Sequence, residues 1–168
     1  MKRVIKFSLN YILIAIIGTL FHFMYKWTGE NVYLAFLWPV NESIFEHLKM
    51  FFFPVMLVSL IQLIFVKEDK GLFLSSRLYG VLYAIIGCIA FYYVYKINVP
   101  EVKEVVFILS YYVFLFLGLF MSYNIYRYMK TMPEYLQWVA FSIAVLLVVT
   151  FICFTYKPLD TEFFKILK

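Results

Sequence analysis

The chain has 168 residues, of which 65% are hydrophobic, 23% aromatic and 15% charged. Soluble globular proteins are about 45–50% apolar and about 25% charged, so this chain has too few charged residues for the surface of a soluble or disordered protein. The net charge of +5 comes from Lys and Arg residues scattered between apolar runs, which argues against a nucleic-acid partner. Two cysteines exclude a disulfide scaffold and a four-thiolate zinc site. Composition therefore predicts an integral membrane protein whose partner is membrane lipid.

Five apolar runs are long enough to cross bilayer hydrocarbon of about 30 Å, which takes about 20 helical residues. They predict an all-α membrane bundle, a single transmembrane domain over residues 1–168 with five spans. The second run is long enough only if its helix begins near Ser43, so we expect that helix to begin between Asn41 and Glu46. The predicted spans are residues 4–26, 43–66, 72–97, 105–128 and 135–157.

The positive residues predict the orientation, because cytoplasmic loops are enriched in Lys and Arg. A cytoplasmic amino terminus puts on the inner side Lys2, Arg3, Lys6, Lys67, Lys70, Arg77, Arg127 and Lys130. The outer loops then hold only Lys26, Lys96 and Lys103. Five crossings place the carboxyl tail outside, where Lys157, Lys165 and Lys168 weaken the asymmetry without reversing it. We expect Arg77 and Arg127 to extend toward the cytoplasmic surface.

Residues 39–49, Pro-Val-Asn-Glu-Ser-Ile-Phe-Glu-His-Leu-Lys, are the densest ionisable stretch of the chain and adjoin a span. A charge in the middle of a span costs about 2.5–3.5 kcal/mol, so it usually faces a protein interior or water. At about 100° per residue, the polar side chains share a sector about 160° wide and the apolar ones take the opposite side. The polar sector holds Glu42, Ser43, Glu46, His47 and Lys49, and the apolar side holds Ile44, Phe45, Leu48, Phe51 and Phe52.

Helix capping explains part of this stretch. Asn41 or Ser43 is a good N-cap, and Ser43-x-x-Glu46 matches a capping box. His47 and Lys49 have no part in a cap. Asn41, Ser43 and Lys49 form a further polar cluster in the same stretch as His47.

The other histidine, His22, lies near the outer end of the first span, at the predicted depth of His47 on a neighbouring helix. We expect His22, Glu42, Glu46 and His47 to converge as catalytic residues on one cavity. Such a cluster can carry out acid/base chemistry or bind a divalent metal, with His22, Glu46 and His47 as ligand candidates joined by Glu42. Neither zinc-peptidase motif occurs, neither His-Glu-x-x-His nor His-x-x-Glu-His. The alternative for His22 is a boundary residue that donates a hydrogen bond to a carbonyl.

A family resemblance rests on Gly18, His22 and Phe23, on residues 39–49, and on the run Phe51-Phe52-Phe53-Pro54. These residues resemble a family of small bacterial polytopic membrane proteins of unknown function with the signature Pro-Val-Asn-Glu-Ser-x-x-Glu-His-x-Lys. The chain departs from the family in having Phe45 where Trp is expected and in a shorter Pro- and Asp-bearing tail at residues 157–162. The resemblance implies a bacterial inner-membrane location, but it does not indicate any particular activity.

Three functions are compatible with this sequence. The first is a membrane-embedded enzyme that acts on a lipid or amphiphile at the outer leaflet through the Glu/His cluster. The second is a small transporter or channel, but beyond Pro54 the second span offers only Ser59 and Gln62 as polar positions, so a homo-oligomer would have to complete the pathway. The third is a non-catalytic accessory subunit.

Overall fold

The computed structural model describes residues 2–67, 69–99 and 104–165. The described part of the chain contains five long helices and two short 3-10 helices, joined by loops. All five long helices are long and apolar enough to cross a membrane, which confirms the predicted all-α membrane bundle. The long helices are α1 (Lys2–Trp27), α2 (Ile44–Leu63), α3 (Lys70–Asn98), α4 (Glu104–Tyr128) and α5 (Glu134–Tyr156), and the short ones are η1 (Val32–Leu34) and η2 (Glu162–Phe164).

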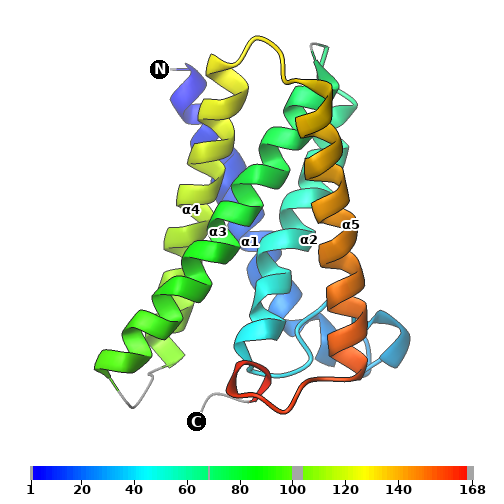
Figure 1. Ribbon diagram of the computed structural model, residues 1–168, viewed down its shortest axis with the longest axis vertical. Helices are drawn as coiled ribbons and strands as arrows, with labels where there is room; N and C mark the ends of the chain where they lie inside the picture. The colour runs from blue at the N-terminus through cyan, green and yellow to red at the C-terminus, as the bar shows by residue number, and fades with distance from the viewer. Residues whose placement is uncertain (1, 68, 100–103, 166–168) are drawn as a thin grey trace.

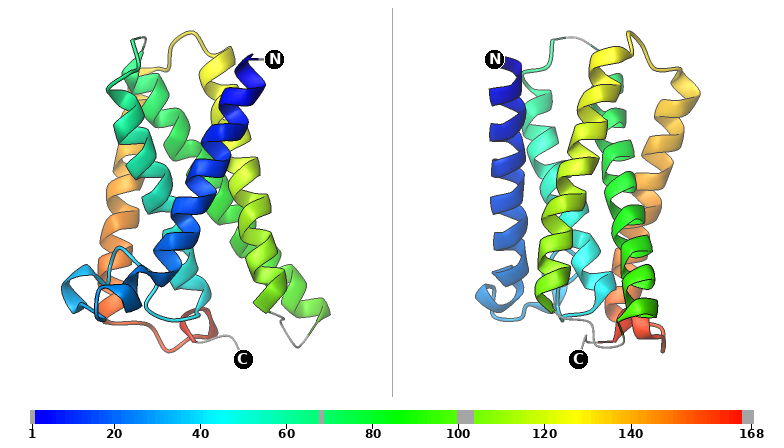
Figure 2. Two further views of the ribbon diagram at one scale, coloured as in Figure 1. Left: turned by 180° about the vertical axis from the view of Figure 1, so that it is seen from behind. Right: turned by 90° about the vertical axis from the view of Figure 1, so that its left-hand side faces the viewer.

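Consecutive helices run antiparallel, so the two termini lie at opposite ends of the bundle (Figure 1). We call the end where α2 begins the site end; it holds the loop of residues 28–43 and the tail of residues 157–165. The other end, the amino end, holds the start of α1 and the loops of residues 64–69 and 129–133. Helix α2 packs against α1 and α3, and α4 packs along α3 and against α1 (Figure 2).

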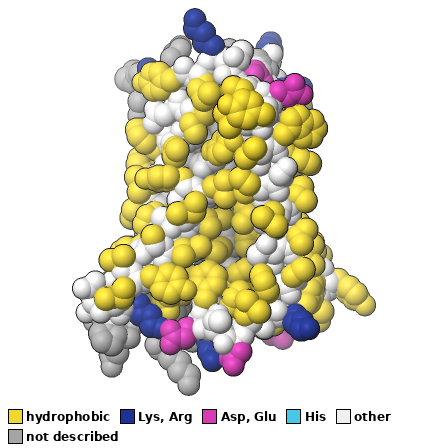
Figure 3. All heavy atoms as spheres, in the orientation of Figure 1, with side chains coloured by type: hydrophobic (Ala, Val, Ile, Leu, Met, Phe, Trp, Pro, Cys, Tyr) yellow, Lys and Arg dark blue, Asp and Glu magenta, His cyan; other side chains and the backbone are white. Residues whose placement is uncertain are grey.

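The sides of the bundle are apolar. Hydrophobic side chains cover the face shown in Figure 3, and charged side chains gather at its two ends. Large apolar side chains remain exposed on the outer helices, among them Leu9 on α1, Leu109 on α4 and Leu146 on α5. This distribution suits a multi-pass protein surrounded by lipid. Which end of the bundle is cytoplasmic stays a prediction. Among the positive residues on which that prediction rests, Lys103 and Lys168 lie outside the described residues, as do the side chains of Lys2 and Arg3.

Helices α3 and α4 approach each other closely at two glycines. A Cβ atom added to Gly80 would lie 2.4 Å from the carbonyl oxygen of Gly118, and a Cβ atom on Gly118 would lie 2.4 Å from that of Gly80. Only residues without a side chain allow such an approach of two backbones. This contact holds α4 against α3.

The sequence predicted that Arg77 extends toward the cytoplasmic surface, but in the structure its guanidinium is held inside the bundle. Its Nη2 atom donates a hydrogen bond of 3.2 Å to Gln62 Oε1, and its guanidinium lies 5.2 Å from the centre of the Phe73 ring. Gln62 Nε2 in turn donates to Asn10 Oδ1 at 2.6 Å. Polar partners inside the bundle replace water here, and the resulting network links α1, α2 and α3 near the amino end.

The carboxyl tail covers part of the site end. Phe163 in η2 packs against a buried cluster formed by Ile44, Tyr92 and Phe107, and Glu162 forms an ion pair with Lys96. The tail therefore ties the start of α2 to the ends of α3 and α4 that lie beside it.

Candidate functional site

Helix α2 begins at Ile44 with Ser43 as its N-cap. Ser43 Oγ accepts a hydrogen bond of 3.4 Å from the backbone N–H of Glu46, and Asn41 Oδ1 accepts one of 2.9 Å from the N–H of Ser43. A full capping box would turn the Glu46 side chain back to the N–H of Ser43. That N–H is already bonded to Asn41, so the Glu46 carboxylate is free to turn elsewhere.

Glu46 forms a buried ion pair with Lys49, and the two side chains are 3% and 0% exposed. Lys49 Nζ donates at 2.6 Å to Glu46 Oε2, at 3.0 Å to the carbonyl of Ala35 and at 3.2 Å to that of Trp38. All three ammonium hydrogens thus have acceptors. Glu46 Oε2 also accepts the N–H of Val40 at 2.9 Å. The pair holds the loop of residues 28–43 against α2. The prediction that Glu46 lies together with His22 and His47 is therefore wrong, because its carboxylate is engaged by Lys49 and Val40.

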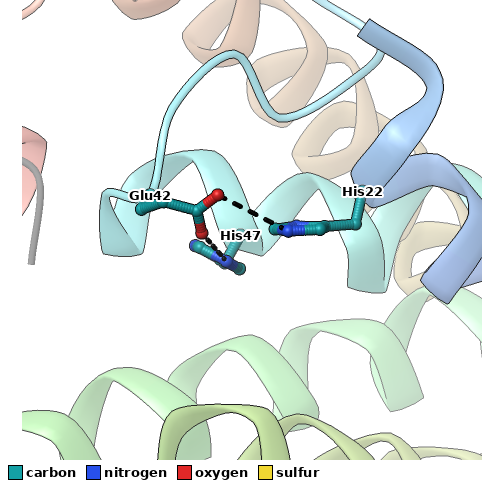
Figure 4. Close-up of side chains that lie close together, drawn as sticks. All are labelled: His22, Glu42 and His47. Atoms are coloured by element: carbon teal, nitrogen blue, oxygen red, sulfur yellow. Dashed lines mark ion pairs between the residues drawn. The ribbon is translucent and has the colours of Figure 1, made fainter. Parts of the chain in front are cut away.

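The other three predicted residues meet at the site end: His22 from α1, Glu42 from the loop before α2, and His47 from α2 (Figure 4). The Glu42 carboxylate lies between the two imidazoles, with Oε1 at 3.5 Å from His22 Nε2 and Oε2 at 3.3 Å from His47 Nε2. One ligand atom from each residue lies within 4.8 Å of the other two. We call these three residues the His/Glu cluster.

A backbone carbonyl orients the His47 ring. His47 Nδ1 lies 2.7 Å from the carbonyl oxygen of Ser43. A carbonyl can only accept, so Nδ1 carries the hydrogen and Nε2 is the atom directed at Glu42. Metal-binding histidines in proteins are commonly held in this way, with one ring nitrogen on a carbonyl and the other free for the metal.

The surroundings of Glu42 keep its carboxylate ionised. The hydrogen bond with His47 lowers the pKa of Glu42 below its usual value, and positive charge on His22, His47 and Lys26 acts in the same direction. Partial burial opposes this effect but is outweighed. At neutral pH the His/Glu cluster therefore offers an anionic oxygen ligand or proton acceptor.

A cavity of about 470 Å³ opens beside the His/Glu cluster, between α1, α2, α3 and α4. The three cluster residues lie together in its lining, and the remaining lining is mostly aromatic or aliphatic. Tyr111 Oη is buried in the lining without a hydrogen-bond partner among the described residues, whereas Tyr112 Oη shares a hydrogen bond of 2.9 Å with Thr19 Oγ1. The cavity is lined by Thr19, His22, Phe23, Glu42, His47, Met50, Phe51, Cys88, Phe107, Ile108, Tyr111 and Tyr112.

Two imidazoles and one carboxylate can do two kinds of chemistry. They form a ligand set found in catalytic zinc sites, where a fourth position stays open for water or substrate, and in non-haem iron sites. Without a metal, the same groups can accept and donate protons within hydrogen-bond reach of a bound molecule.

Comparison with protein-family models matches residues 2–166 to a family of unknown function. The chain belongs to the DUF6512 family. The match covers nearly the whole chain, so the relationship extends beyond residues 18–54, on which the sequence resemblance rested. Neither the curated proteins nor the solved structures include a match to this DUF6512 chain.

Several cavity residues of the DUF6512 chain were not predicted from its sequence. Phe107, Tyr111 and Tyr112 come from α4, and Cys88 comes from α3. Helix α4 is apolar on all sides, so no periodic pattern marks the face that lines the cavity. The only signal is the pair of adjacent phenols at positions 111 and 112 within an uncharged run.

Proposed function

We propose that this DUF6512 chain is a membrane-embedded enzyme that acts on a lipid or another amphiphile through His22, Glu42 and His47. The observation that supports this function is that the His/Glu cluster lines a cavity of about 470 Å³ whose lining is otherwise mostly apolar. Small-molecule sites are typically concave and apolar, with a few convergent polar groups that fix orientation. Here the ionisable groups of the lining, apart from phenols and a thiol, are His22, Glu42 and His47, whose ligand atoms lie within 4.8 Å of one another.

The cavity matches an amphiphile in polarity. A polar group of the substrate can reach the His/Glu cluster, and its apolar part can lie along Phe107, Ile108 and Met50, which line the cavity. Burial of hydrocarbon against such side chains is favourable by about 25 cal/mol per Å². The surrounding bilayer is the natural source of molecules of this kind.

The leaflet follows from the predicted orientation. The His/Glu cluster lies at the site end, opposite the amino end that carries Lys67, Lys70 and Lys130. With positive residues cytoplasmic, the substrate is held at the outer leaflet of the membrane.

The lining favours an enzyme over a channel. The part of α2 that lines the cavity ends at Phe51. Farther along α2, Gln62 is hydrogen-bonded to Asn10 and Arg77, so its polar groups are engaged within the bundle. A polar pathway through one subunit would need such groups to face an opening.

Comparative lipid mass spectrometry tests the proposed function. Membranes from cells that produce the natural chain are compared with membranes from cells that produce equal amounts of the Glu42→Gln or His47→Ala variant. We expect at least one lipid or amphiphile to fall and a related product to rise with the natural chain only. The matched control is Glu30→Gln, which changes an exposed carboxylate of the same loop outside the cavity. Identical lipid profiles for the natural chain and both cluster variants would contradict an enzymatic role.

A further inference from the structure

In the His/Glu cluster, Nε2 of each imidazole faces one carboxylate oxygen of Glu42. His47 Nδ1 carries the ring hydrogen because it bonds to the Ser43 carbonyl, so Nε2 of the neutral ring presents a lone pair to Glu42 Oε2 at 3.3 Å. Lone pairs on a nitrogen and an anionic oxygen repel at this distance. A cation between the two atoms is attracted by both.

A single metal ion can supply that positive charge to all three side chains, since one ligand atom from each lies within 4.8 Å of the other two. The centroids of the two imidazole rings are 5.4 Å apart, so both rings can reach one ion. One cation shared by the three side chains removes the repulsion and leaves both rings neutral, which is the form that binds metals.

The observed spacing suits zinc. With Zn–N and Zn–O distances of about 2.0–2.1 Å, neighbouring ligand atoms of a tetrahedral site lie about 3.3 Å apart. The two contacts of Glu42 with the imidazoles, made by different carboxylate oxygens, measure 3.5 and 3.3 Å, and one ligand atom from each of the three residues lies within 4.8 Å of the other two. Only small side-chain movements are needed to place them around one ion.

We infer that His22, Glu42 and His47 bind one Zn²⁺ ion, with a fourth coordination position open to the cavity. This inference deepens the proposed function and rests on it only for the role of the metal, since binding is measured without a substrate. In such a site zinc polarises a substrate oxygen or lowers the pKa of bound water. The lining residues Phe107 and Ile108 then hold the apolar part of the substrate near that position.

Zinc binding is measured on the full-length chain purified in detergent. The protein is equilibrated with zinc buffered by a chelator, and bound zinc, iron and manganese are counted by plasma mass spectrometry. We expect one zinc ion per chain and an affinity at least about tenfold lower in His22→Ala, Glu42→Gln and His47→Ala. Glu30→Gln is the matched control and keeps the natural affinity. All variants retain Cys88 and Cys153, so zinc held by thiols would persist in each of them.

A second measurement guards against misfolded variants. Zinc raises the thermal unfolding temperature of the natural chain, because a ligand that binds the folded state stabilises it, and we expect this rise to be lost in Glu42→Gln while its zinc-free unfolding is still cooperative. Absence of bound zinc in the natural chain, equal retention by the cluster variants and the control, or iron or manganese in place of zinc would each overturn the inference. Zinc binding with unchanged lipid profiles would refute the enzymatic role alone, and changed lipid profiles without zinc would refute the metal alone.

Discussion

At the scale of single residues, Lys49 shows how a cation is accommodated in the interior of an apolar helix bundle. Its ammonium group is fully buried and bonded to Glu46 and to two loop carbonyls. Removal of one partner of a buried ion pair typically costs about 3–5 kcal/mol, since the other charge is left unpaired. We therefore predict that Lys49→Met lowers the free energy of unfolding by about that amount, as measured by denaturation in detergent.

The double variant Glu46→Gln/Lys49→Met is the control for this prediction. It removes both charges, so we expect a smaller loss of stability than in Lys49→Met alone. A larger loss in the double variant would show that the pair is not coupled as the geometry indicates.

Ser43 separates helix capping from the His/Glu cluster. Its hydroxyl caps α2, whereas its backbone carbonyl holds His47. Loss of an N-cap side chain typically costs about 0.5–2 kcal/mol. We predict that Ser43→Ala lowers stability by that range in thermal unfolding and leaves zinc affinity unchanged, because alanine keeps the carbonyl. A loss of zinc affinity as large as that in His47→Ala would contradict this division of roles.

Part of the site could be predicted from single residues and part could not. Counting residues along the spans placed His22 and His47 at one depth, and the structure brings their rings together. The helical wheel could not tell Glu42 from Glu46. That choice depends on the loop of residues 28–43, which folds back so that its carbonyls meet Lys49, and a loop path has no periodicity to read.

At the scale of elements, the contact of α3 with α4 depends on the absence of side chains at Gly80 and Gly118. We predict that Gly80→Ala costs about 1–3 kcal/mol of stability, because its methyl group meets backbone that must move, 2.4 Å from the Gly118 oxygen. Gly87→Ala on the same helix is the matched control, since its methyl group meets the Phe114 ring at 2.7 Å, and a side chain can turn away. Thermal unfolding of both variants measures the difference, and an equal or smaller loss in Gly80→Ala would contradict the close backbone contact.

The elements themselves were predictable from run length, because a bilayer demands about 20 apolar residues for each crossing. How they pack was not. The lining of the cavity by α4 and the network of Arg77 with Gln62 arise from contacts between helices whose faces are nearly uniform in hydrophobicity.

At the scale of the whole molecule, the orientation can be tested with cysteines at the two ends. Tyr33 at the site end is 88% exposed, and Thr131 lies exposed in the loop between α4 and α5 at the amino end. With Cys153 replaced by alanine, we predict that Tyr33→Cys reacts with a membrane-impermeant maleimide in intact cells. Thr131→Cys should react only after the membrane is opened. The reverse pattern would invert the topology and move the proposed substrate to the inner leaflet.

The order of the three proposed zinc ligands along the chain has a consequence for biogenesis. His22, Glu42 and His47 all lie within the hairpin of α1, its loop and α2, which leaves the ribosome before α3 and α4. The hydrophobic walls from α3 and α4 are added later, and η2, which follows α5 in the chain, covers the site end after them. The three proposed zinc ligands can thus come together before the walls of the cavity from α3 and α4 exist, and mutations in α4 can reshape those walls without disturbing the ligands.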